Sequence, residues 1–308
     1  MKKHDVAVVG EIYIDHIFTG FAAWPQPGEE AFTREYMREI GGGAANTACA
    51  LAKLGRSVSL FGAIGAADAG WFDRRLQEFG VSSDGLEKTD GNTGVTVSVS
   101  MRDDRSFFSY MGENERLMAI LRSGSVLASL KQARHVHFAM PLEHEIAMSV
   151  LPALRAAGCT TSLDVGFTPD WLQARVNLDI CRAIDYFLPN EREATLLSGG
   201  DVSGYLSFAQ REGLSGPVVK LGSRGAAMLA NGIEYKVSSS PVEVVDTTGA
   251  GDAFDAGFID ALLDDASPED CLRRACICGA LSTRAAGALS ALPLRKELEN
   301  IYEQTYTS

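Results

Sequence analysis

A glycine-rich segment at residues 246–254, DTTGAGDAF, carries the residue types best suited to chemistry. Its small residues let several backbone N–H groups converge, and the apolar residues that follow predict a helix that begins there. A helix N-terminus attracts negative charge, and Asp252 stands beside it. Phosphoryl transfer to an alcohol needs both features, because N–H groups hold the transferring group and a carboxylate accepts the proton. Asp252 is thus the candidate general base, and Gly249, Ala250 and Gly251 form the candidate anion hole. The alternative is a glycine turn in which Asp252 only caps the helix.

A second glycine-rich segment, GGAANTA at residues 42–48, is followed by Gly55 and Gly65. DTTGAGDAF resembles the C-terminal signature of the ribokinase-like (PfkB) carbohydrate kinases, and this second segment resembles their N-terminal signature. The two occur in the order of that family, and the resemblance covers nearly the whole chain. It implies an α/β fold: a three-layer αβα domain over residues 1–308, with a mostly parallel central sheet and a small β-sheet lid.

The resemblance also implies where an acceptor sugar binds. Asp15 follows the first expected strand, where ribokinase-like enzymes use an aspartate to bind sugar hydroxyls. A carboxylate can accept two hydroxyl hydrogen bonds at once. Gly42, Gly43 and Asn46 are expected to add backbone and amide contacts. Glu143 is placed like a sugar-contacting glutamate, and its alternative is a solvated loop acid.

An Asn-x-x-Glu pattern, Asn190 to Glu193, follows a strand-like run. It resembles the family motif whose asparagine and glutamate hold Mg²⁺ through water, which suits an ion that prefers oxygen ligands and keeps several waters. Leu188 stands where many members have asparagine, and the same spacing is also common in helix caps. The resemblance implies ATP as co-substrate and Mg²⁺ as cofactor, with Asn190 near the nucleotide and Glu193 as the metal-holding acid.

A strand and turn at residues 218–226 resembles the family segment beside the nucleotide, and glycines there permit close backbone approach. The candidate nucleotide contacts are Lys220, Gly222, Ser223 and Gly225. A plain hairpin turn is the alternative. Asp246 is the candidate ligand of a monovalent cation such as K⁺, with Thr248 and the loop near Gly287 supplying further oxygens.

Apolar runs predict the elements that position these residues. Strands are expected at 5–10, 58–64, 135–140, 160–164, 186–188 and 218–221, and a helix at 44–54 that ends at Gly55. Strands that alternate with helices predict a parallel sheet covered on both faces, and such sheets bind ligands at the carboxyl ends of their strands. Alternating segments at about 12–38 and 92–110, with Asp103 and Asp104 at a turn, predict the lid sheet. In the resembling family this lid covers the sugar and often contacts a second copy, so a homodimer through the lid is expected; surface hairpins without a gating role are the alternative.

Composition narrows the class of protein. Hydrophobic residues make up 46% and charged residues 22% of the chain, which is typical of a globular protein with a sizeable core. A net charge of −12 argues against a nucleic-acid or anionic-membrane partner. The apolar run at 6–9 is too short for a signal sequence or a membrane span, so we expect a cytoplasmic protein. The six scattered cysteines are expected to be buried thiols, and the alternation around His135 and His137 indicates a strand rather than a metal site.

Together with the family resemblance, which implies ATP and Mg²⁺, these observations predict a kinase that phosphorylates a primary hydroxyl of a small sugar: an aldopentose, a ketohexose or a sugar acid. A nucleoside kinase on the same fold is the alternative, because a nucleobase could stack on lid aromatics. Those aromatics, which could equally bury a dimer interface, are Phe18, Trp24, Phe32, Phe107, Phe108 and Tyr110. A non-catalytic sugar-binding protein is a remote alternative, because it would not need Asp252, the anion hole and the Asn-x-x-Glu pattern together.

Overall fold

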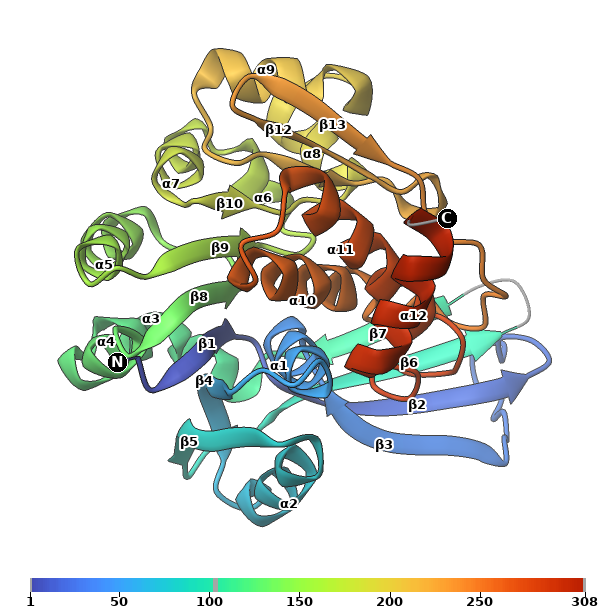
Figure 1. Ribbon diagram of the computed structural model, residues 1–308. Coiled ribbons are helices and arrows are strands. Elements are labelled where there is room, and N and C mark those ends of the chain that lie inside the picture. Colours follow the sequence, from blue (N-terminus) through green and yellow to red (C-terminus); the bar gives the residue numbers. More distant parts are fainter. Residues whose placement is uncertain (1, 102–104, 307–308) are drawn as a thin grey trace.

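The computed structural model describes residues 2–101 and 105–306. Its centre is a six-stranded sheet in which all neighbouring strands are parallel, in the order β10-β9-β8-β1-β4-β5 (Figure 1). The predicted strands are confirmed to within two residues at their ends. The sequence pattern does not predict β5, an edge strand in which only Val81 and Leu86 are buried. The strands are β1 (His4–Gly10), β4 (Val58–Gly65), β5 (Val81–Thr89), β8 (Ala133–Ala139), β9 (Thr160–Asp164) and β10 (Tyr186–Phe187).

A three-stranded antiparallel sheet extends the central sheet beyond β10. It consists of β11 (Val218–Lys220), β12 (Ala226–Ala230) and β13 (Ile233–Val237). Parallel bridges from Phe187 to Pro217 and from Asn190 to Lys220 place β11 beside the end of β10. The turn between β11 and β12 requires glycine at Gly225, because φ there is 95° and a Cβ atom would overlap the carbonyl oxygen of Val237.

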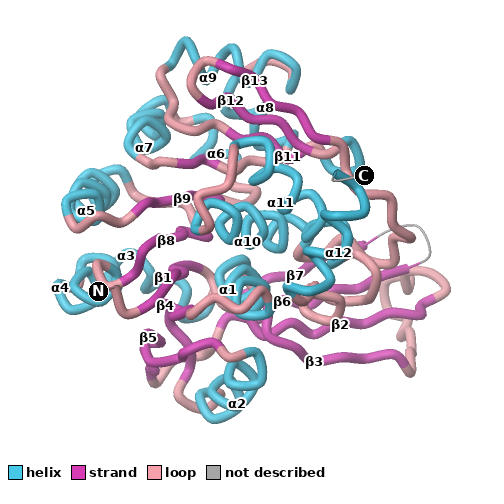
Figure 2. The backbone as a smooth tube through the Cα atoms, in the orientation of Figure 1, coloured by secondary structure: helices cyan, strands magenta, loops and turns pink. Residues whose placement is uncertain are grey.

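Helices cover both faces of the central sheet, which confirms the predicted three layers (Figure 2). Successive side chains of a strand point to opposite faces. Accordingly, Val6 and Val8 of β1 pack in a cluster with α1, α2 and α10, whereas Ala7 and Val9 pack with α3, α5 and α7. The helices of the first face are α1 (Gly43–Lys53), α2 (Ala69–Phe79), α10 (Ala250–Leu263), α11 (Pro268–Ser282) and α12 (Arg295–Tyr306). Those of the second face are α3 (Leu117–Arg122), α4 (Gly124–Leu130), α5 (His144–Ala156), α6 (Pro169–Gln173), α7 (Leu178–Ala183), α8 (Glu191–Ser198) and α9 (Tyr205–Glu212).

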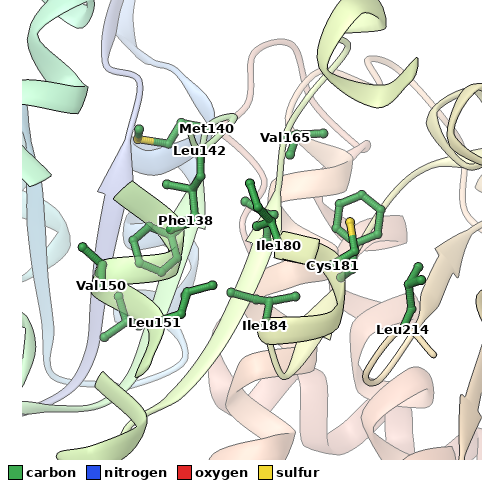
Figure 3. Close-up of a cluster of buried hydrophobic side chains, with 14 of the residues drawn as sticks. Phe138, Met140, Leu142, Val150, Leu151, Val165, Ile180, Cys181, Ile184 and Leu214 are labelled. Atoms are coloured by element: carbon green, nitrogen blue, oxygen red, sulfur yellow. The ribbon is translucent and has the colours of Figure 1, made fainter. Parts of the chain in front are cut away.

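The apolar cluster on the second face fixes β8 and β9 relative to the helices behind them. Figure 3 shows Phe138 of β8 close to Val150 and Leu151 of α5, with Ile180 and Ile184 at α7. None of these side chains is more than 4% exposed, and full burial of such a side chain contributes about 1.5–3 kcal/mol. This packing holds the carboxyl ends of β8 and β9 in place, where the candidate site lies. Among the described residues, no helix has the length and apolar character needed to cross a bilayer.

The two predicted lid segments pair in one four-stranded sheet of order β3-β2-β6-β7. Its strands are β2 (Tyr13–Phe21), β3 (Glu35–Gly41), β6 (Gly94–Met101) and β7 (Arg105–Tyr110). The pairs β2–β3 and β6–β7 are antiparallel, and β2–β6 is parallel. β3 continues past the predicted limit at 38 and ends at Gly41, directly before the glycines that begin α1. The predicted turn at Asp103 and Asp104 includes residues outside those described.

Cysteines and histidines take structural positions. All six cysteines are free, buried thiols, as predicted. His135 and His137 lie buried on β8, and each has a ring nitrogen within 2.7–2.8 Å of the Ser162 hydroxyl. Burial lowers the pKa of His135 to about 3 and that of His137 to about 4, so both imidazoles are neutral at pH 7.

Candidate active site

A cavity of about 770 Å³ lies at the carboxyl ends of the central strands. Residues that follow β1, β8, β9, β10 and β11 line it, together with the N-terminal ends of α1 and α10. Parallel sheets bind ligands at this edge. The lining includes most of the site residues predicted from sequence: Gly43, Asn190, Glu193, Lys220, Gly222, Ser223, Gly225, Gly249, Ala250, Gly251 and Asp252.

The predicted anion-hole segment forms the N-terminus of α10, which begins at Ala250 after Gly249. Gly249 adopts a left-handed conformation with φ 74°, and a Cβ atom there would stand 2.5 Å from the Cβ of Ala288. The first-turn N–H groups of a helix have no carbonyl partner within the helix, and the helix dipole adds positive potential. A Cβ on Gly251 would stand 3.4 Å from the Lys220 ammonium, so a fixed positive charge lies next to the same loop. The loop is therefore suited to hold an anion.

Asp252 lies in the first turn of α10 and contacts α1. Its Oδ2 accepts a hydrogen bond of 2.8 Å from Asn46 Nδ2, and a Cβ on Gly43 would stand 3.4 Å from its Oδ1. Burial raises the pKa of Asp252 to about 7, although the hydrogen bond from Asn46 favours the charged form. A carboxylate with a pKa near 7 has the basicity expected of a general base at neutral pH.

Lys220 is held by two carboxylates on the face of the sheet beneath α10. Its Nζ donates to Asp164 Oδ2 at 2.5 Å and to the Asp255 oxygens at 3.2 and 3.3 Å. Burial alone would raise the pKa of Asp164, but the charge of Lys220 and hydrogen bonds hold it at about 2. Burial raises the pKa of Asp255 well above its usual value, and its hydrogen bond with Asp164 acts in the same direction.

Sequence reasoning did not select Asp164 or Asp255, although both had a recognisable position. Asp164 is the last residue of a predicted strand, and polar residues at that end of a parallel strand face the ligand edge. Asp255 follows Asp252 by three residues on one helix, so both side chains share a face. One oxygen from each of these three acids lies within 4.8 Å of the others. Lys220 already supplies a cation to Asp164 and Asp255.

The Asn-x-x-Glu segment caps α8. The Asn190 side chain accepts a hydrogen bond from the Glu193 backbone at 3.0 Å, and Glu193 Oε2 accepts one from the Asn190 backbone at 2.9 Å. Both residues also line the cavity. Burial, followed by the nearby charge of Asp164, raises the pKa of Glu193 to about 7. Since each carboxylate oxygen has two lone pairs, the cap leaves Glu193 able to accept hydrogen bonds from a hydrated cation.

Of the predicted acceptor residues, Gly43 lines the cavity, and Asn46 is hydrogen-bonded to the lining residue Asp252. Asp15 on β2 packs against Gly41, where a Cβ atom would overlap its carboxylate. Burial and the charge of Glu39 raise the pKa of Asp15 to about 7, and the charge of Asp15 in turn raises the pKa of Asp252. Gly42 has φ 90°, and a Cβ there would overlap the Glu11 carbonyl oxygen. Glu11, which sequence reasoning did not select, lines the cavity directly after β1.

Five predicted residues are absent from the cavity lining: Asp15, Gly42, Asn46, Glu143 and Asp246. Glu143 is exposed before α5, where its Oε2 accepts a hydrogen bond of 2.9 Å from Arg122, so we do not include it in the site. Asp246 accepts backbone hydrogen bonds from Thr248 at 2.7 Å and from Gly287 at 2.8 Å. These bonds join the glycine-rich segment to the Gly287 loop, and the role of Asp246 as a cation ligand stays a prediction.

Known carbohydrate kinases resemble this chain in sequence and in fold over nearly its whole length. The model of the "pfkB family carbohydrate kinase" matches residues 3–295. A ribokinase of Haemophilus influenzae is 26% identical over 96% of this chain and 97% of its own length. An ATP-dependent ribose-1-phosphate kinase of Halopiger xanaduensis is 32% identical over 87% of this chain and 88% of its own length. The structure of an Arabidopsis thaliana ribokinase complexed with ribose and ATP superimposes with a TM-score of 0.85 at 27% identity, covering 97% of this chain and 98% of that one.

The fold and these similarities define a phosphotransferase of the α/β class that acts on an alcohol group. The chain belongs to the pfkB family of carbohydrate kinases.

Proposed function

We propose that this protein transfers the γ-phosphoryl group of ATP to a primary hydroxyl of a small sugar, with Asp252 as the general base. The observation that carries the proposal is the position of Asp252 in the first turn of α10, beside the backbone N–H groups of Gly249–Gly251 and within hydrogen-bond distance of Asn46. The carboxylate accepts the proton of the acceptor hydroxyl as its oxygen attacks phosphorus. The N–H groups of the loop stabilise the charge on the transferring group.

The nucleotide occupies the part of the cavity between α10 and the β11–β12 turn in this proposal. Gly222, Ser223 and Gly225 line that part, and the glycines permit close backbone approach. Lys220, next to Gly251, adds positive charge near the phosphates. The Lys220 ammonium stays in place without a ligand because Asp164 and Asp255 hold it.

Asn190 and Glu193 fit a magnesium ion held through water, because their oxygens line the cavity and keep unused lone pairs. When bound, Mg²⁺ would neutralise charge on the phosphates. Asp246 with Thr248 and the Gly287 loop is the corresponding proposal for K⁺, and a potassium titration without effect on rate would remove it.

The register of the lid argues for a sugar over a nucleoside. Asp15 pairs with Thr96, which pairs with Ser109, so these side chains share the face toward the site. Phe108 and Tyr110 alternate with Ser109 and therefore lie on the opposite face. Phe18 lies on that outer face too. It pairs with Val99, and Val99 points to the same side of β6 as Val97, the partner of Phe108. A base bound beside Asp15 would reach only Phe107 among the β7 aromatics.

The outer face of the lid supports a second proposal, a homodimer through this sheet. Its aromatic side chains are strongly exposed, with Tyr36 at 52%, Phe108 at 60% and Tyr110 at 56%. Large exposed apolar patches mark interaction surfaces. Sedimentation of the purified protein at micromolar concentration tests this, and a monomer would contradict it.

The test of the proposed function is Mg·ATP-dependent release of ADP across a panel of sugars, sugar acids and nucleosides. We expect turnover with at least one sugar, a product phosphorylated at a primary hydroxyl by NMR, and loss of turnover in Asp252→Asn. A nucleoside as the best acceptor would favour the alternative kinase. Folded protein that binds ATP and turns over no acceptor would contradict the proposal.

A further inference from the structure

Near the acceptor end of the cavity, Asn46 has its amide nitrogen engaged in a hydrogen bond while its amide oxygen has no donor. Asn46 is 5% exposed, and its Nδ2 donates to Asp252. Its Oδ1 is buried and has no hydrogen-bond partner. A buried amide oxygen without a partner costs about 1–3 kcal/mol, and a hydrogen-bond donor on a ligand beside Asp252 would relieve this cost.

Glu11 adds a carboxylate at the same end. Its Oε2 accepts a hydrogen bond of 3.0 Å from Tyr13, and the residue lines the cavity together with Gly43 and Asp252. The Tyr13 hydroxyl also lies 3.1 Å from the Met111 sulfur, and Tyr13 itself is 8% exposed. Tyr13 therefore orients the Glu11 carboxylate while its own hydroxyl is engaged with the protein.

Positive charge is confined to the other end. Among the described residues that line the cavity, Lys220 is the one cation, and its ammonium is bound by Asp164 and Asp255. Two described arginines near the lid are paired with acids outside the lining, Arg38 with Asp68 and Arg75 with Glu39. An anionic group at the acceptor end would thus meet the carboxylates of Glu11 and Asp252 in the lining, with the charge of Asp15 nearby, while Lys220 is already paired with Asp164 and Asp255.

We infer that the acceptor is an uncharged, hydroxyl-rich molecule and that Glu11 is the residue that excludes sugar acids and sugar phosphates. This inference rests on the proposed kinase function and narrows its substrate class. It separates this chain from its ribose-1-phosphate kinase relative, whose name states an anionic acceptor. Hydroxyl groups donate to Asn46 Oδ1 and to the carboxylates, whereas a phosphate or carboxylate has no proton to donate at neutral pH.

Two like charges about 5 Å apart at a partly buried site, where the effective dielectric constant is about 20, disfavour binding by roughly 100-fold or more. Amide replacement of Glu11 removes one of these repulsions and keeps an acceptor oxygen for hydroxyl groups. It therefore acts more strongly on the binding of anionic sugars than on that of neutral ones.

The experiment measures kcat/KM for matched neutral and anionic acceptors: D-ribose against D-ribose 1-phosphate, and D-glucose against D-gluconate. In the wild type we expect the neutral member of the preferred pair to exceed the anionic one by at least about 100-fold. Glu11→Gln should lower the ratio of neutral to anionic kcat/KM by about tenfold or more, because kcat/KM for the anionic acceptor rises. Glu212→Gln is the matched control, because it removes a carboxylate that pairs with Arg182 at the end of α9, and its ratio should equal that of the wild type. A wild type that prefers the anionic member, or a ratio unchanged in Glu11→Gln, would overturn the inference.

Calorimetry keeps this result separate from the proposed function. Wild-type protein saturated with a non-hydrolysable Mg·ATP analogue is titrated with D-ribose and with D-ribose 1-phosphate. If no acceptor is phosphorylated, the kinase proposal fails, but tighter binding of ribose still supports the inference. Tighter binding of ribose 1-phosphate, or no binding of any uncharged sugar in the panel, overturns it. If Glu11→Gln does not fold, Asp15→Asn replaces it: this variant should weaken neutral sugars and still narrow the ratio.

Discussion

The two ends of the cavity differ in how far the protein satisfies its own polar groups. At the phosphate end, Lys220 is bound by Asp164 and Asp255, and Asn190 and Glu193 bond to one another. At the acceptor end, Asn46 Oδ1 has no partner, and the pKa values of Asp15 and Asp252 are both raised to about 7 by burial. One end is preorganised around fixed charges, and in the proposed function the other is completed by its ligand.

The difference has a physical reason. ATP brings several negative charges, which only fixed and oriented donors can stabilise without reorganisation during the reaction. A sugar, the proposed acceptor, brings hydroxyl groups that can donate to these unpaired or partly desolvated oxygens. Leaving Asn46 Oδ1 and two acids partly desolvated costs stability, and this cost is offset by packing elsewhere, as in the cluster around Phe138.

Asp252 lies between the two ends, beside the anion-hole loop and Asn46, so its replacement should have the largest effect on activity. Asp252→Asn should lower kcat by about 10²–10⁴-fold, because the amide cannot accept the hydroxyl proton. The unfolding temperature of the Asp252→Asn variant should not fall, because the raised pKa of Asp252 means that the fold disfavours the ionised carboxylate at pH 7. ADP release and calorimetric melting measure the two effects. Activity within tenfold of the wild type would exclude Asp252 as the base.

Lys220 tests whether the phosphate end is built around its fixed charge. Lys220→Met leaves the charge of Asp164 buried without its partner, so unfolding free energy should fall by about 3–5 kcal/mol. Adding Asp164→Asn should restore much of this loss, because both members of the ion pair are then neutral. Urea titration of the single and double variants provides the measurement. A Lys220→Met variant as stable as the wild type would show that the ion pair does not contribute this free energy of unfolding.

Gly249 tests the geometry of the loop that joins the two ends, with a smaller effect. Gly249→Ala must hold a left-handed φ of 74° and move the Ala288 side chain, which should cost about 1–2 kcal/mol and raise the KM for ATP. Gly124→Ala at the start of α4 is the matched control, because a Cβ atom there meets no heavy atom within 4 Å. Melting temperature and KM should change in the first variant only. Equal behaviour of both variants would mean that the loop tolerates a side chain.

Local sequence signals predicted most of the fold, and they fail at identifiable places. The apolar strands and the glycine signatures at Gly43 and Gly249 lie as predicted because short-range chemistry determines them. β5 could not be predicted, since its polar residues belong to an edge strand held by its pairing with β4. The partners of Lys220 were missed for a similar reason: Asp164 of β9 and Asp255 of α10 are far from Lys220 in the sequence and meet it only in the folded chain. Glu143 was misplaced for the same reason, because its partner on the surface, Arg122, comes from a distant part of the sequence.

The pH dependence of kcat/KM with the best sugar acceptor tests the central claim most directly, because the base is effective only when Asp252 is ionised. Its folded-state pKa of about 7 predicts activity that rises from pH 5 through about pH 7 and then levels off. Asp15 and Glu193 titrate in the same range, so the profile is repeated in Asp15→Asn and Glu193→Gln, and each variant should keep the acidic limb. In Asp15→Asn the limb should move to lower pH, because the charge of Asp15 raises the pKa of Asp252. A wild-type profile that is flat from pH 5 to 8, or a limb that disappears in either variant, would contradict Asp252 as the general base.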